Sequence, residues 1–190
     1  PEMVNDFAPS YPAQATDVSY GRTFGSSTTT ILPSGASGKY KFPTSAAIYN
    51  GTNYAAGDMG NGDAAGWNRS TNYDDSAWAN FSSGLGYDAN GLFSTLVSTN
   101  IQTTMRSINN SVCARMKFNV ANPNAYNFYK IRIKYEDGCT VFLNGASAPI
   151  INYGNPTTLA FNSLSSNASN STWQQWWEVN VPASSIVAGD

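Results

Sequence analysis

Histidine is absent from all 190 residues, and this absence excludes more chemistry than any other feature of the sequence. Without imidazole the chain has no Ser-His-Asp or Cys-His catalysis and no histidine-ligated metal site. Charged residues are also scarce, at 12% against roughly 25% in an average domain. The net charge of −2 offers no overall basic character, so we do not expect nucleic acid as a partner.

Long apolar runs are missing as well. No stretch approaches the roughly 18 consecutive apolar residues of a membrane span, and "PEMVNDFAPSYP" lacks the basic and apolar regions of a signal peptide. Asn, Ser, Thr and Gly replace the missing charges, and aromatic residues reach 13%. This composition is typical of a secreted β-protein. We therefore expect an extracellular or cell-surface location, for a processed product or an internal piece of something longer.

The sequence has only two cysteines, Cys113 and Cys139, too few to staple a domain of this size. Both lie in strand-like runs. Alternation along "VCARMKFNV" places Cys113 with Arg115 on the face opposite Ala114 and its apolar neighbours, whereas Cys139 shares its parity with apolar residues. The sequence is compatible both with a disulfide between Cys113 and Cys139 and with two separate thiols.

Two regions differ in their patterning. Residues 1–28 carry three prolines and a Gly/Ser/Thr-rich end, which predicts an extended arm or linker. Residues 29–190 carry short β-patterned runs, and residues 43–66 between them predict a long surface loop. The expected strands are "TTILPSG", "GKYKF", "VCARMKFNV", "FYKIRIKY", "CTVFLNG", "APIINY", "TTLAF" and "WQQWWEVNV". No apolar period of a helix persists over three turns, so we expect an all-β sandwich or barrel.

The stretch "EDGCTVFLNG", residues 136–145, has several interpretations. Asn144-Gly145 is a strong hairpin signal, because both turn positions need positive φ, and Gly138 allows a tight bend at the strand entrance. Glu136 and Asp137 can accept backbone N–H bonds or pair with Arg115 there. A metal loop and a catalytic carboxylate are the alternatives. We interpret the stretch as scaffolding.

The order of several motifs resembles that of a known family. "GWNRSTNYDDSAW", "GLGYD", "CARMKFNV" and "YKIRIKYEDGCTVFLNG" together resemble a bacterial extracellular module with the galactose-binding-domain-like fold. The module is similar to the sugar-binding domain that precedes the catalytic barrel in some β-galactosidases. The matching positions are Trp67, Asp74, Asp75, Ser76, Trp78, Leu85, Gly86, Tyr87, Arg115, Asp137, Gly138, Val141, Leu143, Asn144 and Gly145.

The resemblance covers roughly residues 30–190 and implies a jelly-roll β-sandwich. The sequence departs from the family pattern at Asp88, Cys113 and Cys139. The arm adds a second resemblance, because "FAPSYPAQATDVSYGR" resembles the tail that follows lamin-tail-like domains in large secreted bacterial proteins.

The end of the sequence also differs from the family. In related modules the segment that matches "VPASSIVAGD" leads into one more strand of the sandwich, whereas the sequence stops at Asp190. A sandwich without its last strand has an open edge. We therefore expect either that the polypeptide continues or that a strand from another chain fills the gap. "DVSYGRTF" in the arm of a neighbouring copy is a possible donor.

The positions of Asp and Glu in this sequence match neither a catalytic pair nor a standard metal-binding loop. A glycosidase needs two carboxylates across a cleft, and no pair here has such a setting, so we expect no enzyme. Calcium is the more credible ion, because Asp58, Asp63 and Asp88 stand on Gly/Asn-rich turns with Asn61 and Asn90 beside them. The spacing is not that of an EF-hand, so solvated loops are the alternative to a structural Ca²⁺ site.

Aromatic side chains are the natural groups for binding a sugar, because the apolar face of a pyranose stacks on a ring. Strand parity in "STWQQWWEVNV" directs Trp177 inward and Trp176 outward. Trp173, Tyr153, Tyr49 and Tyr54 lie in or beside loops and complete the candidate ligand-binding set. Two more tryptophans, at positions 67 and 78, are expected in the core.

The expected function is therefore a non-catalytic, carbohydrate-binding accessory module of a larger secreted or cell-surface bacterial protein, with a polysaccharide or glycan as its partner. The alternative is a structural or assembly module of a surface fibre or multidomain adhesin, in which copies exchange strands or contact neighbouring domains. The high Asn/Ser/Thr content and the proline-rich arm suit both.

Overall fold

The computed structural model describes residues 27–43, 48–49, 66–146, 150–154, 159–160, 163–165 and 172–189. The chain divides into two compact units, Pro1–Thr30 and Ile31–Asp190. In the first unit, the described residues 27–30 form no helix or strand. All elements and contacts below belong to the second unit.

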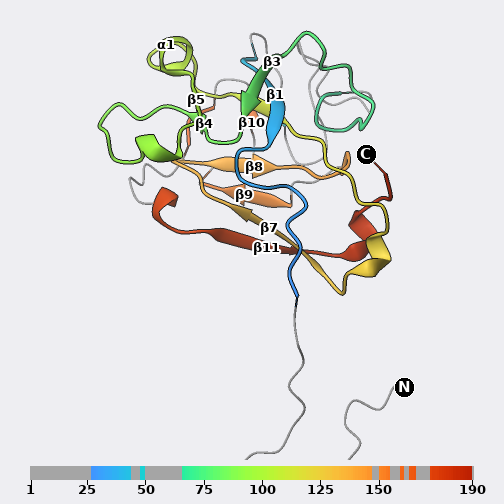
Figure 1. Cartoon of the computed structure of the whole chain (residues 1–190). Coiled ribbons are helices and arrows are strands. Elements are labelled where there is room, and N and C mark those ends of the chain that lie inside the picture. Colours follow the sequence, from blue (N-terminus) through green and yellow to red (C-terminus); the bar gives the residue numbers. More distant parts are fainter. Residues whose placement is uncertain are drawn as a thin grey trace, which may run out of the picture. The chain divides into compact units, whose positions relative to one another are not determined.

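The second unit is rich in short strands, which confirms the expected β-rich class (Figure 1). Its described strands are β1 (Ser37–Lys41), β2 (Ile48–Tyr49), β3 (Ala79–Ser82), β4 (Leu85–Gly86), β5 (Thr99–Asn100), β6 (Cys113–Arg115), β7 (Tyr129–Ile133), β8 (Cys139–Val141), β9 (Ile151–Tyr153), β10 (Leu159–Ala160) and β11 (Trp177–Val181). The helices are α1 (Gln102–Met105) and the 3-10 turns η1 (Ser94–Leu96), η2 (Pro123–Ala125), η3 (Thr172–Gln174) and η4 (Ala183–Ser185).

The strands form one three-stranded sheet and four pairs. The sheet has the order β3-β1-β6 and is antiparallel. β7 pairs with β11, β8 with β9 and β2 with β10 in antiparallel register, whereas β4 and β5 are parallel. In Figure 1, β8, β9, β7 and β11 are drawn below β1 and β3. A buried cluster of Val120, Tyr129, Leu143, Val181 and Ile186 joins β7 and β11 to the segments beside them.

The β7–β11 pair follows the alternation expected from its sequence. Tyr129 and Val181 are buried, and Ile131 and Val179 between them are half-buried and pack against the buried cluster. The intervening side chains of both strands are exposed. Full burial of an aliphatic side chain of this size contributes about 1.5–3 kcal/mol, so the inward face holds this pair in register and leaves the outward face available for other roles.

The Asn-Gly turn is confirmed. Ala146 donates its N–H to the carbonyl of Leu143 at 3.0 Å, and the two central residues, Asn144 and Gly145, have φ of 49° and 72°. Positive φ at both positions is what a type I′ turn requires. The turn lies inside a longer connection, because the β8–β9 register closes only at Val141 and Ile151.

The bend at the entrance to β8 is centred one residue earlier than predicted. Gly138 does not have the positive φ; Asp137 does, at 61°. The N–H of Gly138 donates to the carbonyl of Glu136 at 3.0 Å, which closes a three-residue γ-turn around Asp137. Aspartate is one of the few residues besides glycine that adopts this conformation.

Several other strand predictions were wrong in detail. Residues 29–36 form no strand, and the predicted loop over 43–66 contains β2, although most of that loop lies outside the described residues. In β6 the inward and outward faces are reversed, because Ala114 is exposed while Arg115 is largely covered. The cause is the ion pair that Arg115 makes with Asp75, which turns this face of the strand inward.

No disulfide joins Cys113 and Cys139, and both are half-buried thiols. Burial raises the pKa of the Cys139 thiol to about 12, so this group is almost entirely protonated at neutral pH. Within the described part of the chain, no helix is long and apolar enough to cross a membrane.

Near its end the described chain begins a new antiparallel pairing. Val120 and Gly189 exchange both backbone hydrogen bonds, at 3.2 and 3.1 Å. This bridge places Gly189 alongside the segment that leads out of β6. Whether a further strand belongs there stays a prediction.

Candidate functional site

The outward side of the β7–β11 pair gathers charged and aromatic side chains into one surface. The register pairs Arg132 with Glu178 and Lys130 with Asn180. Extended by one residue, the same register sets Lys134 opposite Trp176. We call the six residues together the outer face: Lys130, Arg132, Lys134, Trp176, Glu178 and Asn180.

Trp176 is the aromatic residue of the outer face, and its prediction as an outward-facing side chain is confirmed. The residue is 47% exposed, although it directly precedes the half-buried Trp177. Two cations lie over its ring: the guanidinium carbon of Arg132 at 5.0 Å from the ring centroid and the ammonium of Lys134 at 5.5 Å. Cations within about 6 Å of an indole face are attracted by its quadrupole, so they orient the ring while leaving much of it open.

Glu178 organises the other end of the outer face. Its carboxylate accepts a bond from the ammonium of Lys130 at 2.6 Å and one from Nε of Arg132 at 2.7 Å. The hydrogen bond from Lys130 is the main reason why the pKa of Glu178 lies below its usual value. Among the described residues, Lys134 has no carboxylate partner.

Sequence reasoning missed Arg132 and Lys134 as site residues. The alternation of "FYKIRIKY" does predict that both point outward, and "WQQWWEVNV" predicts the same for Trp176. The missing information was that β7 and β11, separated by more than 40 residues, are direct neighbours. Strand pairing over such a distance is not encoded in either local pattern.

The other aromatic candidates lie elsewhere. Trp173 packs against Phe93 with ring centroids 5.4 Å apart. Tyr153 stacks on Tyr135 at 5.5 Å and contacts Trp177 at 5.3 Å, so it belongs to a cluster that includes the inward-facing tryptophan. The set predicted from sequence is therefore not a single patch of mutually contacting rings in the described part of the chain.

The remaining aromatic predictions have mixed outcomes. Of Tyr49 only the backbone, in β2, is described, and Tyr54 lies outside the described residues. Trp78 is buried at 6% exposure, which confirms its core position. Trp67 is half-buried beside it, with ring centroids 6.1 Å apart.

Of the predicted calcium ligands, Asp88 is the one whose environment is described; Asp58 and Asp63 lie outside the described residues. Its carboxylate accepts backbone N–H bonds from Asn90, Gly91 and Phe93 at 3.1, 2.9 and 2.6 Å. Desolvation alone would raise the pKa of Asp88, but these bonds outweigh it and lower the pKa. The carboxylate of Asp88 thus stabilises the turn that follows it. Among the described residues, no group of three or more acidic or cysteine side chains is suited to bind a metal ion.

Glu136 and Asp137 do not pair with Arg115, contrary to one of the expectations for this stretch, because Arg115 pairs with Asp75. Burial is the main cause that raises the pKa of both carboxyl groups, and the neighbouring charge of Asp137 adds to the effect on Glu136. Glu136 accepts a long bond of 3.4 Å from the hydroxyl of Thr172. These contacts are compatible with the scaffolding interpretation.

Compared with protein families, characterised proteins and solved structures, the chain has no significant match.

Proposed function

We propose that this chain is a non-catalytic carbohydrate-binding module of a secreted or cell-surface protein, with a galactose-binding-domain-like jelly roll as its fold. The β-rich architecture supports the fold, and the low charge with abundant Asn, Ser and Thr supports the location. The observation that carries the function is Trp176, a half-exposed indole held on a sheet surface among polar side chains.

The outer face provides both kinds of contact that a sugar needs. The open part of the Trp176 ring can stack on the apolar face of a pyranose, and Asn180, Glu178 and Arg132 carry donors and acceptors for hydroxyl groups. The surface is a sheet face and not a deep cavity, so little of a ligand would be buried. We therefore expect weak binding to an extended polysaccharide and not tight capture of a monosaccharide.

Replacing Trp176 with alanine is expected to weaken polysaccharide binding at least tenfold, because the stacking surface is lost; a factor of ten corresponds to about 1.4 kcal/mol. Isothermal titration against a panel of neutral and acidic polysaccharides measures this. Ile108→Ala is the matched control, since Ile108 is an exposed apolar residue (68%) that follows α1. Undiminished binding by the Trp176→Ala protein would contradict the assignment of the outer face.

A specific observation also favours the second candidate function, an assembly module. Val120 pairs with Gly189 through both backbone bonds, and alternate residues of a strand direct these groups to the same edge. Met116 and Phe118 lie between β6 and this bridge, in a segment (residues 116–119) that forms no strand in the described part of the chain, so the edge beside them has no strand partner there. Such an edge can accept a strand from a second copy.

Strand exchange between copies makes self-association depend on protein concentration. If the edge beside Met116 and Phe118 serves assembly, sedimentation velocity is expected to show species larger than a monomer that grow with concentration from micromolar to millimolar levels. A monomer over this whole range would exclude self-assembly through this edge.

A further inference from the structure

The charges of the outer face are unbalanced. It carries three cations, Lys130, Arg132 and Lys134, against one carboxylate, Glu178, which amounts to +2 on this surface. The whole chain has a net charge of −2. A local excess of the opposite sign, centred on an exposed aromatic ring, does not follow from the overall composition, and it creates a positive potential that attracts anions.

The partners of these cations show which of them are available. Glu178 forms ion pairs with Lys130 and with one nitrogen of Arg132. Lys134 contacts the Trp176 ring and, among the described residues, no carboxylate. Arg132 also keeps the two terminal nitrogens of its guanidinium, because the ion pair uses only Nε. The donors nearest to the ring are therefore the ones that remain free to bind an anion.

We propose that the outer face binds an acidic polysaccharide, whose sugar ring stacks on Trp176 while its carboxylate or sulfate group accepts bonds from Lys134 and Arg132. This proposal rests on the proposed carbohydrate-binding function and adds the charge of its ligand. The guanidinium carbon of Arg132 and the ammonium of Lys134 lie 5.0 and 5.5 Å from the centroid of the indole ring. They place a positive charge beside the stacked ring, where an acidic sugar carries its anionic group.

A nucleic acid is the other polyanion that cations and an aromatic ring could bind. Single-stranded nucleic acid is normally held by several aromatic residues on which successive bases stack, along a groove with many cations. The described outer face has one aromatic residue and three cations, two of which, Lys130 and Arg132, pair with Glu178. This arrangement favours a polysaccharide.

The test uses ligand pairs that differ only in charge. Polygalacturonate and its fully methyl-esterified form present a carboxylate and its neutral counterpart, and dextran sulfate and dextran do the same for sulfate. Isothermal titration is expected to give at least tenfold tighter binding to the charged member of one pair, and the pair that responds identifies the anionic group. The affinity for this member is expected to fall severalfold between 50 and 300 mM NaCl, since salt screens exposed charges.

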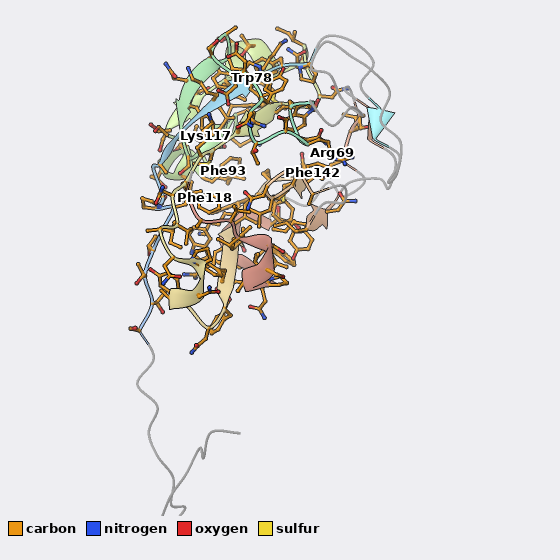
Figure 2. All side chains as sticks on the ribbon, turned by 90° about the vertical axis from the view of Figure 1, so that its right-hand side faces the viewer. Arg69, Trp78, Phe93, Lys117, Phe118 and Phe142 are labelled. Atoms are coloured by element: carbon orange, nitrogen blue, oxygen red, sulfur yellow. The ribbon has the colours of Figure 1, made fainter. Side chains whose placement is uncertain are left out.

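Lys134→Gln separates a specific contact from a general charge effect. We expect it to weaken binding of the acidic polysaccharide at least fivefold and to leave binding of its neutral counterpart unchanged. Lys117→Gln removes an equal charge from an exposed lysine outside the outer face, labelled in Figure 2, and is expected to change neither. Equal effects of the two substitutions would overturn the assignment of Lys134.

The outcomes distinguish this inference from the function on which it rests. Equal, salt-independent binding of charged and neutral members overturns the acidic ligand and leaves the carbohydrate-binding function standing. Lack of binding to every polysaccharide overturns both. Binding to a thymidine oligonucleotide that is lost in Lys134→Gln, without binding to either charged polysaccharide, overturns the ligand class in favour of nucleic acid.

Discussion

Replacement of Gly145 by alanine is expected to destabilise the protein by about 3 kcal/mol or more. Two independent costs combine at this position. Gly145 has φ of 72°, a conformation that costs an L-residue roughly 1–2 kcal/mol. A β-carbon there would also lie 1.9 Å from the carbonyl oxygen of Arg69 and 2.8 Å from its carbonyl carbon. Both atoms are backbone, so they cannot move aside by a change of rotamer.

The close approach of Gly145 to the backbone of Arg69 connects two distant parts of the chain. Gly145 carries no side chain, so the Asn-Gly turn packs directly on the segment that contains Arg69, and Nε of Arg69 donates back to the carbonyl of Gly145 at 3.3 Å. Figure 2 labels Arg69 and Phe142, and Phe142 is two residues before the first central residue of the turn, Asn144. The turn therefore joins the end of β8 to a segment 76 residues away.

Urea denaturation followed by tryptophan fluorescence measures this effect, with Gly35→Ala as the matched control. Gly35 also has positive φ, at 83°, but a β-carbon there would meet nothing within 4 Å. The control is expected to lose only the conformational part, about 1 kcal/mol. Similar losses for Gly145→Ala and Gly35→Ala would show that the contact with the backbone of Arg69 does not constrain the fold.

The structure agrees with the sequence where one local signal suffices. The inward residues of β7, the outward position of Trp176 and the Asn144-Gly145 turn each depend on the chemistry of neighbouring residues. A period of two places the side chains of a strand on opposite faces whatever the partner strand is. An Asn-Gly pair likewise needs no distant contact to favour positive φ.

Predictions failed where distant partners decide the outcome. Apolar alternation favoured Ala114 over Arg115 as the inward residue of β6, but Arg115 finds a carboxylate 40 residues earlier in the chain and turns inward. The cations beside Trp176 were missed for the same reason, because β7 and β11 meet only in the folded chain. Burial of a charge is compatible with folding only when a partner is present, and local patterns do not identify that partner.

Loss of the Arg115 side chain is expected to have the second large effect, about 3 kcal/mol of destabilisation in Arg115→Met. Arg115 donates from Nε to Asp75 at 3.0 Å, and from its terminal nitrogens to the carbonyls of Trp67 and Ser70. Its guanidinium also lies 5.3 Å from the centroid of the Tyr73 ring. Through these contacts one side chain of β6 holds the segment from Trp67 to Asp75, which forms no helix or strand of its own.

The size of the effect follows from burial. The side chains of Arg115 and Asp75 are only 14% and 13% exposed, so methionine fills part of the space but leaves Asp75 charged and without its cation. Removal of one partner from a buried pair typically costs about 3–5 kcal/mol, and the residual exposure places this pair at the lower end.

The exposed ion pair of Arg132 and Glu178 provides a comparison. Arg132→Met is expected to cost less than about 1 kcal/mol of stability, because the side chain of Arg132 is 54% exposed.

Two further variants separate charge from geometry. Arg115→Lys keeps the charge but lacks the planar guanidinium that reaches three acceptors. We therefore expect its stability to lie between those of the wild-type protein and of Arg115→Met. In Asp75→Leu/Arg115→Met both charges are removed, and we expect this double variant to be more stable than Arg115→Met alone, since no unpaired carboxylate remains. Urea midpoints at pH 7 provide the ranking. If the double variant were instead less stable than the single one, the unpaired carboxylate of Asp75 would not be the cause of the stability lost in Arg115→Met.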